Sequence, residues 1–163
     1  MIFPAQTSRL LLRAWREDDF DAFAAMNADP RVMEYFPAPL TREESATFFG
    51  HIREEFQTEG FGLYAVERIS DGLLLGYTGL HRVTFDGLCG QIEIGWRLRA
   101  DAWGNGYAPE AAQACLALAA KLGIEEVIAF TAVANLRSQR VMQKIGMECV
   151  GQFNHPALPE GHP

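Results

Sequence analysis

The sequence is poor in the residues that build disulfide frameworks and metal sites. Its 163 residues include three cysteines and four histidines. The cysteines are odd in number and widely separated, which argues against a disulfide framework, and no cysteine or histidine has the spacing of a zinc ligand. We therefore expect no metal. Each cysteine lies in an apolar pattern without an evident base partner, so we expect buried thiols and no covalent cysteine intermediate; they are Cys89, Cys115 and Cys149.

Long apolar runs are also missing. No segment approaches the roughly 20 apolar residues that a membrane-spanning helix needs. The first residues lack the basic and then apolar pattern of a signal peptide. We therefore expect a cytoplasmic protein with no membrane partner.

Positive charge is scarce as well. Fourteen lysines and arginines face 21 aspartates and glutamates, which gives a net charge of −7. This balance disfavours a general nucleic-acid-binding protein and is compatible with a cationic substrate. The length, with 48% hydrophobic residues, suits a single domain over residues 1–163, as a monomer or a homodimer.

What the sequence does contain is a mixture of strand and helix signals, which predicts an α+β (mixed α/β) fold. Thr41 and Glu44 form a capping box that starts a helix with an apolar face of phenylalanines and Ile52. Turn signals at 70–72 and 86–87 predict antiparallel strands. A strand that follows a helix should instead run parallel to its predecessor. The expected strands are 7–15, 61–68, 73–83, 91–98, 126–132 and 147–153, and the expected helices begin near Glu17, Thr41, Ala108 and Asn135.

The most informative stretch is 103–110, W-G-N-G-Y-A-P-E, between the strand at 91–98 and a helix that Gly123 ends. Two glycines separated by one residue allow a tight turn and leave the amides of the first helical turn uncovered. Such amides, together with the helix dipole, favour a phosphate or diphosphate. Pro109 fits the first helical turn, where its missing N–H has no partner to lose.

Two other phosphate-binding motifs do not fit this stretch. A dinucleotide-binding motif would need a third glycine, where the sequence has Pro109. A P-loop would need four residues between its glycines and then Gly-Lys-Ser/Thr, which is absent. What remains resembles the acyl-CoA loop of the GNAT superfamily of N-acetyltransferases.

Further stretches resemble one branch of that superfamily, the ribosomal-protein-alanine N-acetyltransferases. In order they are T-S-R-L-L-L-R, A-D-P-R-V-M-E-Y, G-L-H-R-V, E-I-G-W-R-L, A-W-G-N-G-Y-A-P-E-A-A and N-L-R-S-Q-R-V-M-Q-K-I-G-M. The resemblance implies a mixed, mostly antiparallel central sheet flanked by about four helices. It implies a bulged central strand that splays from its parallel neighbour. The sequence ends before the family's last strand, so we expect that strand to be missing.

The resemblance also implies acetyl-CoA as co-substrate and the residues that bind it. The backbone of the central strand would pair with pantetheine, and the loop amides would hold the diphosphate. Arg137 is a further candidate for the 3′-phosphate, although exposed arginines are more often plain solvated charge, and Asn135 could simply cap its helix. The implied cofactor-binding residues are Trp96, Arg97, Leu98, Arg99, Trp103, Gly104, Asn105, Gly106, Tyr107, Ala108, Asn135, Ser138 and Arg140.

For catalysis the resemblance implies Glu93 as the group that deprotonates the amine, the amide near Leu98 as the group that polarises the carbonyl, and Ser138 as the proton donor. Met142 stands where many relatives have a tyrosine acid, so Ser138, or a water it holds, takes that role. Because Ile92 and Ile94 point the other way, Glu93 should face the opposite side of the sheet, toward either a substrate cleft or solvent. Tyr35 and Phe36 are candidates for the acceptor wall, or else core residues.

Together these features favour direct transfer of acetyl from acetyl-CoA to a primary amine, either a protein N-terminus or a small amine. The alternative is an acyl-CoA-binding regulatory module without catalysis. The methionine at 142 is the feature that best supports this alternative.

Overall fold

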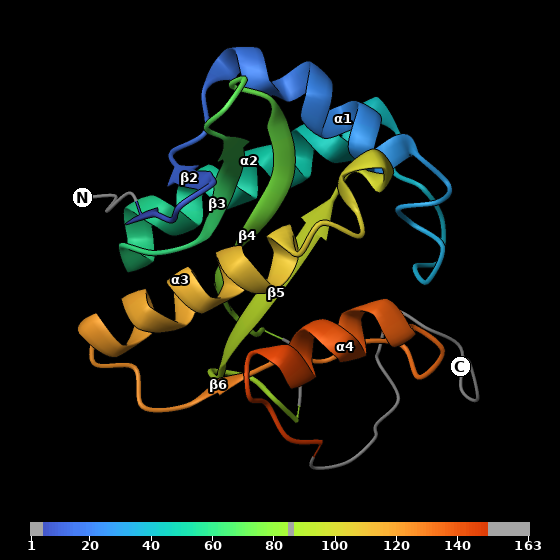
Figure 1. Ribbon diagram of the computed structural model, residues 1–163. Helices are drawn as coiled ribbons and strands as arrows, with labels where there is room; N and C mark the ends of the chain where they lie inside the picture. Colours follow the sequence, from blue (N-terminus) through green and yellow to red (C-terminus); the bar gives the residue numbers. More distant parts are fainter. Residues whose placement is uncertain (1–4, 85–86, 150–163) are drawn as a thin grey trace.

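The computed structural model describes residues 5–84 and 87–149, which form one mixed sheet with helices on both of its faces (Figure 1). The strands are β1 (Ala5–Gln6), β2 (Leu10–Arg13), β3 (Leu63–Arg68), β4 (Leu74–Arg82), β5 (Ile92–Leu98) and β6 (Val127–Ile128). The α-helices are α1 (Phe20–Ala28), α2 (Arg42–Glu59), α3 (Tyr107–Lys121) and α4 (Leu136–Lys144), and the short 3₁₀ helices are η1 (Glu17–Asp19) and η2 (Ala100–Ala102). The predicted α+β class with four α-helices is confirmed.

The strands follow one another across the sheet in chain order, β1 to β6. The first five pair antiparallel, and only β5 and β6 run parallel. The connection from β5 to β6 contains α3, which is the helical crossover that a parallel pair requires. The glycine turn therefore follows directly from the last antiparallel strand.

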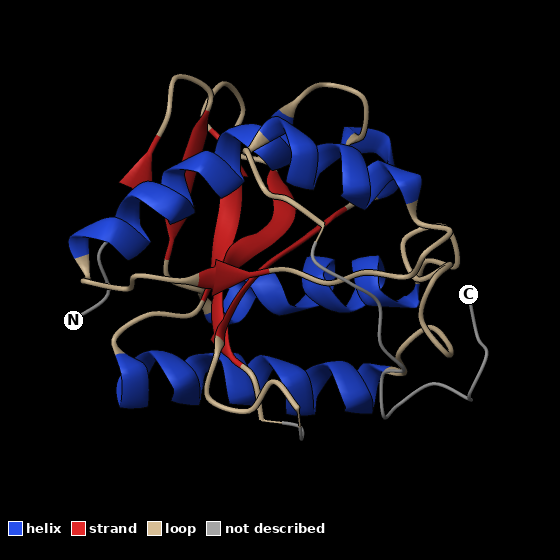
Figure 2. Cartoon of the chain, turned by 90° about the horizontal axis from the view of Figure 1, so that it is seen from below, coloured by secondary structure: helices blue, strands red, loops and turns tan. Residues whose placement is uncertain are grey.

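Helices α1 and α2 cover one face of the sheet, and α3 covers the other (Figure 2). On β4, alternate side chains point to opposite faces. Tyr77 packs edge-on against Phe48 of α2, with ring centroids 5.9 Å apart. The next residue, Thr78, is fully buried on the other face, next to Cys115 on α3, and its hydroxyl donates to the Gly95 carbonyl at 3.0 Å. This alternation decides which side chains of β4 and β5 share a face.

The helix signals read from the sequence operate as expected. The hydroxyl of Thr41 accepts from the amide of Glu44, and the Glu44 carboxylate accepts from the amide of Thr41, so the predicted capping box is confirmed. Helix α3 begins after Gly106, whose φ of 78° is left-handed. It ends just before Gly123, as predicted.

The two strands expected nearest the C-terminus are wrong in extent. The expected strand at 126–132 shrinks to Val127–Ile128, because β6 leaves β5 after two pairs. Of the strand expected at 147–153, residues 147–149 are not strand, and the rest lies outside the described residues. The question of a missing last strand also lies outside them.

Two smaller expectations also fail. Cys115 is buried, but Cys89 and Cys149 are exposed.

The irregularity in the sheet lies between β3 and β4, at Val66 and Glu67, whereas β5 keeps an unbroken register with β4. The expected bulge in the central strand is therefore absent from β5.

Two negative findings bear on the function. Within 5–84 and 87–149, no helix is long and apolar enough to cross a membrane. In the same part of the chain, no group of three or more His, Cys, Asp or Glu side chains could hold a metal ion.

Candidate active site

The parallel pair opens into a slot. Strands β5 and β6 pair only at Ile92 with Val127 and at Glu93 with Ile128. Strand β5 continues to Leu98, paired on its other side with β4 throughout. The second half of β5 therefore has a sheet neighbour on one side only, as the resemblance implied for a splayed pair.

The register shows which backbone groups of β5 face this slot. The amide of Arg99 donates to the carbonyl of Leu75, so residue 99 and every second residue before it bond to β4. The N–H and C=O groups of Trp96 and Leu98 consequently point away from β4, into the slot. Those of Arg97 point toward Tyr77 on β4. The predicted backbone contact of Arg97 with pantetheine is therefore wrong, because the twofold alternation of a strand directs its peptide groups to the opposite edge.

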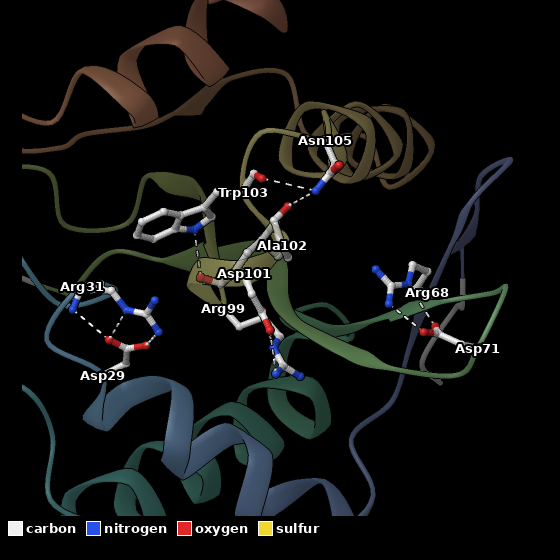
Figure 3. Close-up of polar contacts among 10 residues, drawn as sticks. Asp29, Arg31, Arg68, Asp71, Arg99, Asp101, Ala102, Trp103 and Asn105 are labelled. Carbon is white, nitrogen blue, oxygen red and sulfur yellow. Dashed lines mark hydrogen bonds and ion pairs between the residues drawn. The ribbon is translucent and has the colours of Figure 1, made fainter.

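A cleft of about 1790 Å³ runs along the slot and onto the face of the sheet that α1 and α2 cover. It brings together many of the residues singled out in the sequence. Those that line it are Tyr35, Phe36, Glu93, Trp96, Arg97, Leu98, Trp103, Ala108, Asn135, Arg137 and Ser138. The other predicted cofactor-binding residues are not among the lining residues; they are Arg99, Gly104, Asn105, Gly106, Tyr107 and Arg140. Arg99 is instead bound to Asp101, with Nε 2.6 Å from Oδ1 (Figure 3).

Hydrogen bonds to backbone carbonyls stabilise the glycine turn at the mouth of the slot. Gly104 and Gly106 have φ values of 81° and 78°, which are left-handed. The Trp103 indole donates to the Leu98 carbonyl at 3.1 Å, and the Asn105 amide group folds back onto the carbonyls of Ala102 and Trp103 (Figure 3). Within the described part of the chain, no protein acceptor pairs with the amides of residues 104–108. The turn therefore keeps the free donors that an anion needs.

The N-terminal segment braces this turn from outside. The Arg9 guanidinium donates to the Asn105 carbonyl at 2.9 Å and to the Glu110 carboxylate at 2.7 Å, and it stacks 4.4 Å above the Tyr107 ring. Desolvation acts to raise the pKa of Glu110, but hydrogen bonds from Thr7 and Arg9 hold it below its ordinary value. A carboxylate in the first turn of α3 is thus neutralised beside an anion site. The sequence signal was the stretch T-S-R-L-L-L-R, to which we assigned no role.

Helix α4 borders the slot on the side away from β4. The Asn135 side chain accepts from the amide of Ser138 at 3.2 Å, so Asn135 is an N-cap, which was the simpler of its two predicted roles. Its side chain and Ser138 also line the cleft, and Met142 lines it one turn further along. Arg137 lies 3.7 Å above the Trp103 ring. A cation therefore stands directly beside the glycine turn.

Glu93 lies on the face of β5 away from Ile92 and Ile94, as predicted. It is directly opposite His81 of β4, whose Nδ1 is 2.8 Å from a Glu55 oxygen on α2. Burial raises the pKa of Glu93 to about 7, against a weaker lowering by the charge of His81. The hydrogen bond to Glu55 in turn raises the pKa of His81. Glu93 therefore titrates near neutral pH, in the range where a general base is effective.

The acceptor side of the cleft contains the two aromatic residues proposed from the sequence and two residues that sequence reasoning missed. Tyr35 and Phe36 line it, and Phe36 is 45% exposed, so it is not a core residue. Tyr77 and His81 of β4 also line the cleft, on either side of Gly79 in the sequence. The stretch G-L-H-R-V contained this histidine, but only the pairing of β4 with β5 places it beside Glu93.

The sequence profile of the acetyltransferase (GNAT) domain matches residues 9–148. The chain belongs to the GNAT acetyltransferase family. The family's acetyl donor is acetyl-CoA, so the predicted enzyme class and co-substrate are confirmed.

Individual relatives agree with this family. The uncharacterized N-acetyltransferase YnaD of Bacillus subtilis (strain 168) is 32% identical over 157 residues, 96% of this chain and 88% of that protein. The crystal structure of a GNAT-family acetyltransferase from Bacillus anthracis has a TM-score of 0.77 at 30% identity, over 91% of this chain and 86% of the other. RimL, a ribosomal L7/L12 alpha-N-protein acetyltransferase solved with coenzyme A, has a TM-score of 0.71 at 17% identity, over 88% and 83% of the chains, and shows the fold alone.

The residues present in this GNAT domain fit coenzyme A. The peptide groups of Trp96 and the amide of Leu98 face the slot without a strand partner, and such groups can pair with the amides of a pantetheine arm; the Leu98 carbonyl is already taken by the Trp103 indole. A Cβ added at Gly104 would meet no atom within 4 Å, so the space above the turn is open. Arg137 supplies positive charge at the same end. We propose these residues as the binding site.

The brace at Arg9 gives a first prediction about this GNAT domain. We expect R9M to weaken acetyl-CoA binding by about tenfold, because Glu110 would then repel the diphosphate without compensation. The double variant R9M/E110Q should recover most of that affinity. Isothermal titration calorimetry of the three proteins measures this. If R9M binds as tightly as the wild type, or if the second substitution recovers nothing, the brace has no electrostatic role.

Proposed function

We propose that this protein is an N-acetyltransferase that moves acetyl from acetyl-CoA directly to a primary amine in a ternary complex. The observation that carries the proposal is Glu93, a carboxyl with a pKa of about 7 that lines the cleft beside the splayed strands. Acetyl-CoA supplies the activated acetyl group. The amine nitrogen forms the new bond to the acetyl carbon as the carbon–sulfur bond breaks.

Glu93 removes the proton that the amine must lose, directly or through one water molecule. The position of this base bears on which amide polarises the carbonyl. Leu98 is five residues from Glu93, roughly 16 Å along an extended strand, whereas Trp96 is three residues away, roughly 10 Å. A glutamate side chain and a water can span the shorter distance. We therefore assign the polarising amide to Trp96, and Leu98 to contacts with the pantetheine arm.

The leaving thiolate needs a proton from another group. Met142 cannot supply one, although it lines the cleft. Ser138 lies one turn before Met142 on α4 and also lines the cleft, and the hydrogen bond of its amide to Asn135 fixes the start of the helix there. A water held by its hydroxyl is the proposed proton source.

The buried cysteine, Cys115, is unsuited to form a covalent intermediate. Burial raises the pKa of the Cys115 thiol to about 12, which keeps it protonated and unreactive at neutral pH. Its place on α3, against Thr78, is on the opposite side of the sheet from Glu93. A Cys115 nucleophile would therefore be both uncharged and remote from the amine.

The acceptor can be a protein N-terminus or a small amine, and the weak base suits the first. An α-amino group, with a pKa of about 8, is substantially neutral at pH 7.5, whereas a lysine amine at about 10.4 is not. A base with a pKa of about 7 can therefore deprotonate an N-terminal amine more readily than a lysine amine. We propose α-amines as the preferred acceptors.

Turnover with a panel of amines tests the proposal. The protein is incubated with acetyl-CoA and peptides that begin with alanine or serine, small α-amines, polyamines and lysine derivatives, while free thiol is followed. We expect turnover with α-amines above the rates for ε-amines. Tight acetyl-CoA binding with no turnover on any amine would instead support the non-catalytic acyl-CoA-binding module.

A further inference from the structure

Arg97 is a cation on the acceptor side of the cleft with no carboxylate partner. Among the described residues its one hydrogen bond runs from Nη1 to Asn27 Oδ1, at 2.8 Å, and it makes no ion pair. The guanidinium carbon lies 4.7 Å from the Phe36 ring centroid and 5.2 Å from that of Tyr77. Its Nε is buried and unpaired. The charge is therefore partly desolvated without a compensating anion.

This arrangement differs from that of Arg13, which is buried. Arg13 is bound by two carboxylates, with Nη1 2.8 Å from Asp19 and Nε 3.1 Å from Glu67. Aromatic faces attract a cation but do not replace a bidentate carboxylate, which matches the planar guanidinium. Arg97 lines the cleft, so a ligand there can supply the anion that the protein omits.

Glycine forms the floor of the cleft between Glu93 and Arg97, and Leu63 is the side chain that comes near it. Gly95 lies between these two residues on the same face of β5, and its partner on β4 is Gly79. A Cβ added at Gly95 would meet only Leu63, at 3.9 Å. The α-carbons of Glu93 and Arg97 are four residues apart, roughly 13 Å on an extended strand. One molecule can therefore lie over Gly95 with an end near each group.

We propose that the acceptor carries a carboxylate that Arg97 binds while its amine lies at Glu93. The inference rests on the proposed function and adds the substrate class, an amine with a carboxylate at its other end. A short peptide and a small amino acid both offer this chemistry. The Asn27 amide group donates to Ser45 Oγ at 3.2 Å, which leaves its oxygen to orient the guanidinium.

Matched acceptors that differ only in the carboxylate test this inference. Suitable pairs are 6-aminohexanoic acid with hexylamine, and alanyl dipeptides with the same dipeptides amidated. For the wild type we expect a KM lower by roughly 30-fold for the carboxylate member of a pair. In R97M this preference should vanish through a higher KM for that member, with kcat nearly unchanged. R97K should keep part of the preference. A preference confined to the peptide pair or to the small-molecule pair identifies the source.

Two controls separate recognition from a structural role. R53M removes an arginine of α2 that stacks on Phe49 and does not line the cleft, and it should keep the full preference. If R97M slows both members of a pair equally, Arg97 only ties α1 to β5 and the inference fails. Calorimetric binding of the same pairs in the presence of coenzyme A gives a readout without turnover. If no amine is turned over, the proposed function fails, and equal binding of both pair members separately overturns the role of Arg97.

Discussion

The E93Q variant should lose about 10²-fold or more in kcat/KM at pH 8 and show a flatter pH profile. In the wild type, kcat/KM should fall as the pH falls through about 7, because protonated Glu93 cannot accept a proton from the amine. Glutamine has nearly the same shape and cannot act as a base. The variant should therefore keep only the inflection that belongs to the amine itself. Steady-state kinetics from pH 6 to 9, with one α-amine acceptor, measures both effects.

The same substitution should stabilise the protein at high pH. The pKa of Glu93 is raised in the folded state from an ordinary 4.5 to about 7, so its contribution to stability is present below pH 4.5 and lost as the pH rises through about 7. E93Q has no charge to bury. We expect the free energy of unfolding of E93Q to exceed that of the wild type by about 1–3 kcal/mol at pH 8.5, and to match it near pH 4.5.

E54Q is the matched control for the kinetic and stability effects expected of E93Q. Glu54 lies on α2 next to Glu55 but is exposed and does not line the cleft, so E54Q should change neither kinetics nor stability. Loss of activity together with loss of stability in E93Q would indicate damage to the fold rather than removal of a base. Retention of wild-type kcat/KM at every pH would rule out Glu93 as the base.

The second large effect concerns the glycine turn. We expect G104A to weaken acetyl-CoA binding by at least about tenfold, because the added methyl group enters the open space above the turn and the left-handed backbone is strained. The strain alone should lower the free energy of unfolding by about 1–2 kcal/mol. Calorimetry with acetyl-CoA and denaturant unfolding measure the two quantities separately.

Gly60 provides the control for this variant. It ends α2 with a φ of 78°, close to the 81° of Gly104, and an added Cβ would likewise meet nothing within 4 Å. G60A should therefore lose about the same stability as G104A and keep the full affinity for acetyl-CoA. Equal affinities in the two variants would show that the turn at Gly104 does not contact the co-substrate.

Local signals in the sequence predicted local structure well. The capping box of Thr41 and Glu44, the left-handed turn before α3 and the end of α3 before Gly123 each depend on residues within a few positions of one another. The alternation along 91–98 also predicted the face of Glu93. Such features need no knowledge of the rest of the chain, because backbone geometry and nearby side chains decide them.

Features that depend on a neighbouring strand were predicted less well. The twofold period of a strand shows that the peptide groups of Trp96 and Arg97 point to opposite edges. Only the pairing with β4 shows that those of Arg97 point toward β4. The length of β6 was overestimated because its β-branched residues suit a strand whether or not a partner lies beside them. Exposure of Cys89 depended on packing in the same way.

By itself the sequence determined the family, the order of the elements and the glycine turn, because these follow from residues that act on their own neighbours. Only the tertiary structure placed His81 and Glu55 beside Glu93, and brought Asn27 and three aromatic rings around Arg97. The polar groups of this region come from segments up to 70 residues apart in the chain, as Asn27 and Arg97 do. Their pKa values and unpaired donors are properties of burial and distance, which exist only once the sheet has formed.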